Sequence, residues 1–314
     1  DRMVATVYTI VQNWHCDLVI VQNTMYGYAA LQHIKRSRPQ TKAMDVVHAI
    51  DENWDQAALT AEFAPAIDTR VALSFTAQRR LIESGTAAER VKLLHGGIQL
   101  DRFSASPVRQ DGKQIFYAGR LDAFKRPLLL LDIAERLRTL LGGFDFRFVI
   151  AGEGPALPHL RSLARSLLLE DNVKFIGYLD RAGPLLDCYR AGDLFVFASR
   201  TETQGLVLLE AMALGVPVVA LAEMGTVDIL EPQQGSVIAR NDETDFAERV
   251  SALLSAPALR RSLSAQAVPF AARWDAATQA RKLAQLYDEV IQNRHRSAAA
   301  SIAGAQREFN RQRT

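Results

Sequence analysis

The stretch LFVFASRTETQGLVLLEAMALGVPVVAL, residues 194–221, decides the fold of this chain. It predicts an apolar strand over 194–199, a polar loop, a helix over 206–215 and a second apolar strand over 216–221. Both strands are too apolar to alternate between a buried and an exposed face, so both faces of their sheet must be covered. Strands of this kind that are joined through a helix predict a parallel sheet with helices packed on it.

The same alternation of apolar runs and helical periods extends over the rest of the chain in two series. In the first series we expect strands at 17–22, 42–50, 71–76 and 91–98. The second series has strands at 114–120, 146–154 and 172–179 before the stretch quoted above, and two helices near 245–254 and 275–294 after it.

A chain of 314 residues is long enough for about two domains. The polar segment 99–114, which contains a proline and a glycine, is the expected linker between them. We therefore expect a partial N-terminal domain over 1–107 and a C-terminal domain over 108–274. A crossing helix and tail would follow over 275–314.

The composition excludes several classes of function. Lys and Arg number 37 against 35 Asp and Glu, so the chain lacks the excess of positive charge that nucleic-acid binding requires. Two distant cysteines support neither a disulfide framework nor a cysteine metal site. Because no apolar run approaches the ~20 residues that cross a bilayer, we expect a cytoplasmic protein. Peripheral association with the inner face of a membrane stays open.

Two loops at the carboxyl ends of strands in the second series have the composition of phosphate sites. Arg120 and Lys125 lie in AGRLDAFKRP, ahead of a helix N-terminus, where two cations and free N–H groups suit a diphosphate. The alternative explanation is a solvated basic loop. The second loop, AGEGP, contributes Gly152 and Gly154, whose small size would let the backbone approach a ligand, although a plain strand-to-helix turn is the better explanation of this loop by itself.

The third loop is the polar part of the quoted stretch, and a purely structural explanation does not account for it. Glu202 follows a strand there, while Glu210 lies eight positions later among the apolar residues of the next helix. Gly205 and Leu206 would open that helix and direct free N–H groups toward the side of Glu202. A carboxylate in apolar surroundings needs a partner, and the hydroxyls of a ribose would serve.

The first series offers one candidate, His48, near the end of the expected strand 42–50. A structural histidine is the commoner explanation for such a position. The chain has no Asp-x-Asp pair for a metal-bound nucleotide and no GxxxxGK[ST] phosphate loop.

Taken together, AGRLDAFKRP, FRFVIAGEGP, NVKFIGYL and ETQGLVLLEAMALGVPVVA resemble the family 4 retaining glycosyltransferases. The resemblance covers about residues 115–228, with a looser match over 91–103. It implies an α/β chain with the GT-B fold, in which two Rossmann-like parallel-sheet domains face a cleft. It also implies transfer of a sugar from a nucleotide-diphosphate sugar to a glycan, lipid or small-molecule acceptor. The anomeric configuration would be retained, and no metal or other cofactor would be needed.

The resemblance further implies a role for individual residues. Arg120 and Lys125 would hold the diphosphate, Glu202 would contact the donor sugar and His48 would lie over it. Glu210 would bind the ribose. The other expected donor contacts lie at strand and helix ends, and they are Gly119, Gly152, Gly154, Ile176, Gln204, Gly205 and Leu206.

The chain departs from the family pattern in several places. Thr203 and Gln204 stand where Gly or Ser followed by Phe is usual, and Arg126 replaces a common glycine. Four strands precede the linker where the family normally has six or more, and the Gly-rich loop after the first strand is missing. We therefore expect a fragment, or a chain that needs a partner. The alternative function is a non-catalytic nucleotide-sugar-binding or scaffolding domain.

Overall fold

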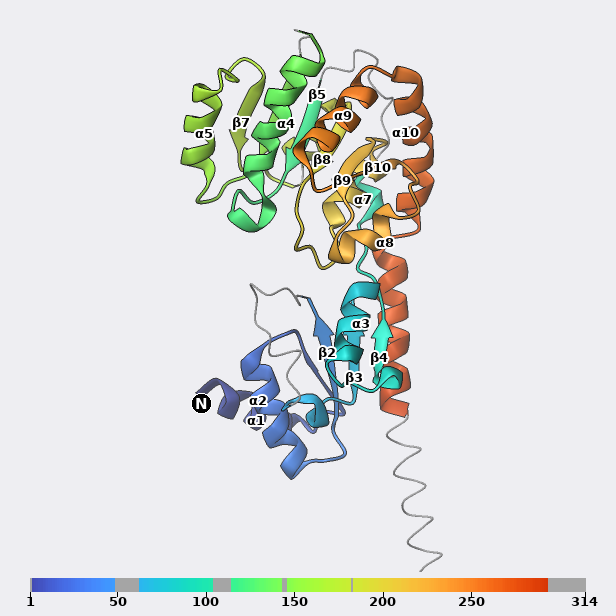
Figure 1. The fold of residues 1–314 in the computed structure, drawn as a ribbon. Helices are drawn as coiled ribbons and strands as arrows, with labels where there is room; N and C mark the ends of the chain where they lie inside the picture. The colour runs from blue at the N-terminus through green and yellow to red at the C-terminus, as the bar shows by residue number, and fades with distance from the viewer. Residues whose placement is uncertain (1, 49–61, 104–113, 143–145, 182, 293–314) are drawn as a thin grey trace, which may run out of the picture. The chain divides into compact units, whose positions relative to one another are not determined.

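The computed structural model describes residues 2–48, 62–103, 114–142, 146–181 and 183–292. The chain divides into two compact units (Figure 1), which are Asp1–His95 with Thr278–Thr314, and Gly96–Ala277. This division differs from the expected boundary after residue 107 and from the expected separate segment over 275–314. In the structure the first unit ends at His95 and takes up the chain again from Thr278. Most of the expected linker, 104–113, lies outside the described residues.

The first unit is built on a four-stranded parallel sheet whose spatial order follows the chain. Its strands are β1 (Leu18–Val21), β2 (Lys42–Val47), β3 (Thr69–Ala72) and β4 (Val91–Leu93). Its helices are α1 (Arg2–Trp14), α2 (Met25–Ser37) and α3 (Phe75–Glu83). Each of the four strands expected in this unit is present among its described residues. A further helical stretch, 276–292, packs Val290 against Met44 and Val71 of this sheet.

The second unit contains a six-stranded parallel sheet in the order β10-β9-β8-β5-β6-β7. Its strands are β5 (Gln114–Ala118), β6 (Arg147–Ala151), β7 (Val173–Gly177), β8 (Leu194–Phe197), β9 (Val218–Leu221) and β10 (Ser236–Ala239). Because β5 stands in the middle, the chain builds outward through β6 and β7 and then reverses to build through β8, β9 and β10. The reversal falls between β5 and β8, which are paired side by side.

Helices cover both faces of this sheet, as the apolar character of its strands requires. They are α4 (Pro127–Leu140), α5 (Leu157–Ser166), α6 (Pro184–Ala191), α7 (Leu206–Ala213), α8 (Val227–Leu230), α9 (Glu243–Leu254) and α10 (Pro257–Ala272). Figure 1 shows α4 beside α9, and α10 packs on α7. Strand β10 and helix α10 were not assigned from the sequence. Pro269 interrupts the helical pattern of α10, which hides that helix from an analysis of periodicity.

Several helices begin where the sequence chemistry places a cap. Pro127 opens α4 at its first turn, where a missing N–H costs nothing. The hydroxyl of Ser74 accepts from the N–H of Ala77 at 3.2 Å and caps α3. Asp242 caps α9 in the same way through the N–H of Asp245. Among the described residues, no helix is both long and apolar enough to cross a membrane.

Candidate functional site

The site lies where the strand order of the second unit reverses. In open parallel sheets the crevice beyond the carboxyl ends of the strands at such a reversal is the preferred ligand position. The loop after β5 carries Arg120 and Lys125, and the loop after β8 carries Glu202. Pairing of β5 with β8 therefore brings together three residues that are up to 82 positions apart in the chain.

Lys125 and Glu202 form a direct ion pair across this reversal. Lys125 lies in the 3-10 turn η5 (Ala123–Lys125), and the side chains of the two residues are 24% and 17% exposed. Both groups are thus partly removed from water while each still reaches the solvent. An ion pair in that position is strengthened relative to one on an open surface.

Arg120 also holds a carboxylate, because its Nε lies 2.9 Å from Oδ2 of Asp122. The Asp122 side chain is nearly buried, whereas that of Arg120 is 76% exposed. The Tyr117 hydroxyl donates to the Arg120 carbonyl at 3.3 Å. Burial raises the pKa of Tyr117, and the charges of Glu202 and Asp122 raise it further, so this hydroxyl stays protonated. Neither Tyr117 nor Asp122 was singled out from the sequence, since Tyr117 is one residue of an apolar strand.

Two glycines allow the loops after β5 and β6 to approach each other closely. A Cβ on Gly152 would lie 1.8 Å from the Gly119 carbonyl oxygen, and one on Gly154 would lie 2.4 Å from that of Leu121. Backbone hydrogen bonds fix the contact, including one from the Leu121 N–H to the Glu153 carbonyl at 2.9 Å. Gly154 therefore serves the packing of one loop on the other, and Gly152 additionally lines the cavity described next.

A cavity of about 420 Å³ opens between these loops. Of the predicted residues, it is lined by Gly119, Arg120, Gly152 and Glu210. Tyr178, Leu179 and Leu185 supply an apolar wall. A mostly apolar cavity with a few converging charged groups is the usual form of a site for a small molecule.

Glu210 lies in α7, and its side chain is 8% exposed. The expectation that it needs a partner is met by protein groups, because Arg181 forms an ion pair with it. The Tyr189 hydroxyl also donates to Glu210 Oε2 at 3.2 Å. Burial and the Glu210 charge raise the pKa of Tyr189 well above its usual value. Arg181 and Tyr189 were missed from the sequence, since only the folded sheet brings their segments against α7.

A second cavity of about 280 Å³ shares Arg181, Leu185 and Glu210 with the first and includes Leu206. Gly205 directly precedes α7 with a φ of +85°, a left-handed conformation that suits glycine. Ile176 of β7 is 39% exposed and lines neither cavity.

The Gln204 side chain, predicted to contact the donor, is bound to the protein backbone. Its side-chain amide is bound at both ends to the backbone of Gly96, and the residue is only 5% exposed. Gln204 lines neither cavity.

His48 belongs to the first unit, where it directly follows β2. Partial removal from water lowers the pKa of its imidazole, which keeps the ring neutral near pH 7.

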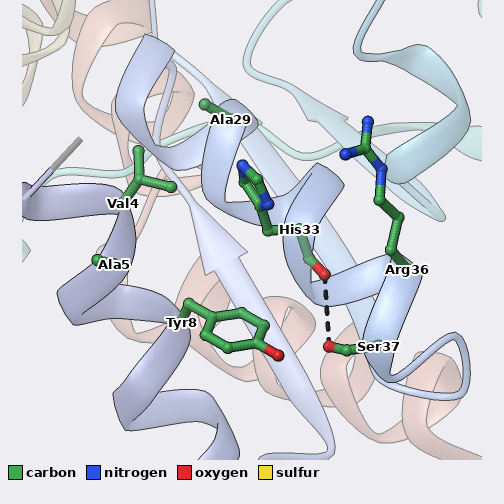
Figure 2. Close-up of a pocket in the computed structure, with 7 residues that line it drawn as sticks. All are labelled: Val4, Ala5, Tyr8, Ala29, His33, Arg36 and Ser37. Carbon is green, nitrogen blue, oxygen red and sulfur yellow. Dashed lines mark hydrogen bonds between the residues drawn. The ribbon is translucent and has the colours of Figure 1, made fainter.

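The first unit has a larger cavity, of about 830 Å³, between α1 and α2. Figure 2 shows Tyr8 of α1 and His33 of α2 beside this space, with the Ser37 hydroxyl bonded to the His33 carbonyl. No predicted site residue lines it, and among its described lining residues Arg36 is the one arginine or lysine. We therefore place the chemistry at the 420 Å³ cavity of the second unit, where several charged groups converge. Within the described part of the chain, no three His, Cys, Asp or Glu side chains are arranged to hold a metal ion.

Comparison with known proteins agrees with this geometry. The family model for glycosyl transferases group 1 matches residues 100–268, more than half of the chain. The chain belongs to the group 1 glycosyltransferases. The matched segment contains the whole β5–β8 reversal and every predicted site residue except His48.

Two members of this glycosyltransferase family show how much of their length the chain spans. D-inositol 3-phosphate glycosyltransferase 2 of Catenulispora acidiphila is 33% identical over 226 residues, which make up 67% of this chain and 53% of that relative. D-inositol 3-phosphate glycosyltransferase of Thermobispora bispora is 28% identical over 305 residues, or 91% of this chain and 68% of the relative. The chain thus spans about half of the first relative and about two thirds of the second.

Solved structures establish the fold of this chain. Anabaena Alr3699/HepE in complex with UDP superimposes with a TM-score of 0.78 at 20% identity, covering 91% of this chain and 82% of that one. The same Anabaena protein with UDP-glucose gives a TM-score of 0.76. The predicted α/β fold of the GT-B type is confirmed.

Proposed function

We propose that this chain binds a nucleoside-diphosphate sugar in the cavity of the second unit and transfers the sugar to an acceptor. The observation that carries the proposal is the set of charged groups at the β5–β8 reversal, where Arg120 and Glu210 line the cavity and Lys125 forms an ion pair with Glu202. The Anabaena neighbour has been solved with UDP and with UDP-glucose, which supports a uridine nucleotide as the first donor to test.

Each side chain of the site has a distinct task in this proposal. Departure of the nucleotide builds negative charge on the diphosphate, and Arg120 and Lys125 are fixed cations that would stabilise it. Free N–H groups at the start of α7 would add to that stabilisation. Glu210 would accept hydrogen bonds from the ribose, and Glu202 would hold the donor sugar. In this proposal Arg120 and Lys125 stabilise the diphosphate as a metal ion would, and the reaction needs no cofactor.

Ligand binding would exchange partners within the site. Lys125 pairs with Glu202, and Arg181 pairs with Glu210, so each group meets an opposite charge before the donor arrives. A diphosphate would compete with Glu202 for Lys125, and ribose hydroxyls would compete with Arg181 for Glu210. Such exchange limits the cost of desolvating the site, because no charge has to be buried alone.

The proposal includes retention of the anomeric configuration, as in the family 4 enzymes that the sequence resembles. His48 is proposed to lie over the donor sugar. The acceptor is proposed to be a glycan, a lipid or a small molecule, and a lipid acceptor would favour peripheral membrane association. The two relatives above are named for transfer to D-inositol 3-phosphate, which makes a phosphorylated polyol the first acceptor to test.

The test is a product assay with a panel of nucleotide sugars, D-inositol 3-phosphate and simple sugars as acceptors, in the presence of EDTA. We expect nucleotide release with an α-linked product from an α-linked donor. A product of inverted configuration would contradict retention, and activity that requires added Mg²⁺ or Mn²⁺ would contradict the metal-free mechanism. The alternative, a binding module without transferase activity, predicts saturable nucleotide-sugar binding and no product.

A further inference from the structure

A buried glutamine links two segments of the second unit that are 108 positions apart in the chain. The Gly96 N–H donates to Gln204 Oε1 at 2.9 Å, and Gln204 Nε2 donates to the Gly96 carbonyl at 2.8 Å. A side-chain amide that satisfies both backbone groups of one residue holds that residue in a single orientation. Because Gln204 is 5% exposed, water does not readily replace either bond.

On one side, this pair holds the segment in which the chain enters the second unit. The first unit ends at His95, so Gly96 is the first residue of the second. Two residues later, Ile98 pairs with the segment that leads back to the first unit. The Ile98 N–H donates to the Trp274 carbonyl, and the Ala276 N–H donates to the Ile98 carbonyl, both at 2.9 Å. Both passages of the chain between the units are therefore tied to one another near Gly96.

On the other side, the pair holds the loop that carries Glu202. Gln204 lies two residues after Glu202 and directly before Gly205, the residue that precedes α7. The Gly225 N–H donates to the Glu202 carbonyl at 2.9 Å, and the Glu202 side chain pairs with Lys125. The loop backbone is thus fixed at Glu202 by Gly225 and at Gln204 by Gly96.

We infer that Gln204 is a positioning residue, which fixes the Glu202 carboxylate for the donor sugar by anchoring its loop to the entering segment at Gly96. This inference rests on the proposed function, in which Glu202 contacts the sugar and Glu210 the ribose. In this role the Gln204 side chain binds the backbone of Gly96 and makes no direct contact with the donor. Loss of the pair should therefore affect recognition of the sugar and leave recognition of the nucleotide intact.

The test compares Gln204→Met, which keeps the volume and removes both hydrogen bonds, with Gln266→Met on the exposed side of α10. Hydrogen exchange of the full chain should accelerate by about tenfold at residues 96–98 and 201–206 in Gln204→Met only. Equal exchange in Gln204→Met and Gln266→Met would overturn the inference.

Calorimetry then separates positioning from a general loss of structure, with UDP and UDP-glucose as the probes. For Gln204→Met we expect UDP affinity within about twofold of the unaltered chain, while the affinity ratio of UDP-glucose to UDP changes by about tenfold. An unchanged ratio, or an equal loss for both ligands, would contradict a positioning role. An unaltered chain that binds neither ligand would count against the proposed function with a uridine donor, and hydrogen exchange would then decide the role of Gln204 by itself.

Discussion

Glu210 is a buried carboxylate whose surroundings indicate a ligand-binding site. Its carboxylate lies in an apolar helix, held by Arg181 and by the Tyr189 hydroxyl, and it lines both cavities. Glu210→Gln keeps an acceptor for Tyr189 and removes the charge. We expect UDP to bind more weakly by ~1.5–3 kcal/mol, because a charge-assisted hydrogen bond to the ribose is lost. Calorimetry measures the change, and Glu231→Gln, an exposed site outside both cavities, is the control. Unchanged UDP affinity would make Glu210 a structural carboxylate.

Lys125 is the residue whose effect should appear in the chemical step. Charge on the diphosphate grows as the nucleotide leaves, so Lys125→Met should lower kcat by about 100-fold and change KM much less. Steady-state kinetics on the most active donor measures both constants. Lys174→Met removes an exposed lysine of β7 and should leave both unchanged. A rise in KM with kcat preserved would instead assign Lys125 to ground-state binding.

At the scale of elements, a buried carboxylate between two strands of the first sheet makes the free energy of unfolding depend on pH. Asp45 of β2 stands opposite Arg70 of β3 in the strand register, and both residues are almost wholly buried. Burial raises the pKa of Asp45 to about 6, against the opposing effects of the Tyr28 hydrogen bond, the Arg70 charge and the Asn23 N–H. The folded state therefore binds the proton more tightly than the unfolded state does.

This raised pKa determines the sign of the pH dependence. The stabilisation is complete below the unfolded pKa of 3.8 and is lost as the pH rises through about 6. The loss is ~3 kcal/mol, because one pKa unit corresponds to about 1.4 kcal/mol. Asp45→Asn should remove this part of the pH dependence. Urea unfolding of the unaltered and variant chains at pH 4 and pH 7.5 measures it. If the free energy of unfolding changed equally between the two pH values in both chains, the assignment to Asp45 would be contradicted.

A second prediction at this scale concerns the junction of α9 and α10. Arg260 of α10 is fully buried and donates to the Leu253 and Leu254 carbonyls at the end of α9, both at 2.6 Å. Arg260→Met would leave these carbonyls without that donor, so we expect the free energy of unfolding to fall by ~2–4 kcal/mol. Arg261→Met, at the next and exposed position, should change it by less than ~0.5 kcal/mol. Similar urea midpoints for the two variants would refute the capping role of Arg260.

At the scale of the whole molecule, the second unit contains every element of the proposed nucleotide site. Its sheet has a core of its own, and the pairing of Ile98 with Trp274 and Ala276 lies entirely within it. We expect residues 96–277 to fold alone and to bind UDP within about threefold of the full chain, but to transfer no sugar. Circular dichroism and calorimetry test folding and binding. An aggregated segment, or one that is fully active in transfer, would show that the first unit has a different role.

The sequence by itself determined the class of fold and the loops that carry the chemistry. Apolar runs alternating with helical periods predict buried parallel strands, because side-chain periodicity reports directly which faces are covered. The stretch around Glu202 and Glu210 and its spacing indicated the glycosyltransferase family, and Glu210 in an apolar helix indicated that a partner was needed. Helix α10 escaped this reasoning because Pro269 interrupts its periodic pattern. Strand β10 was also missed, although it is as long as β8 and β9.

Only the tertiary structure decided which groups meet. Arg181 is 29 positions from Glu210 and Gln204 is 108 positions from Gly96, and nothing in the local sequence of either residue points to its partner. Those contacts depend on the order of strands in the sheet, above all on β5 lying beside β8. That order is set by how the connecting helices pack over the whole sheet, and periodicity, which reports the burial of each segment separately, carries no information about it.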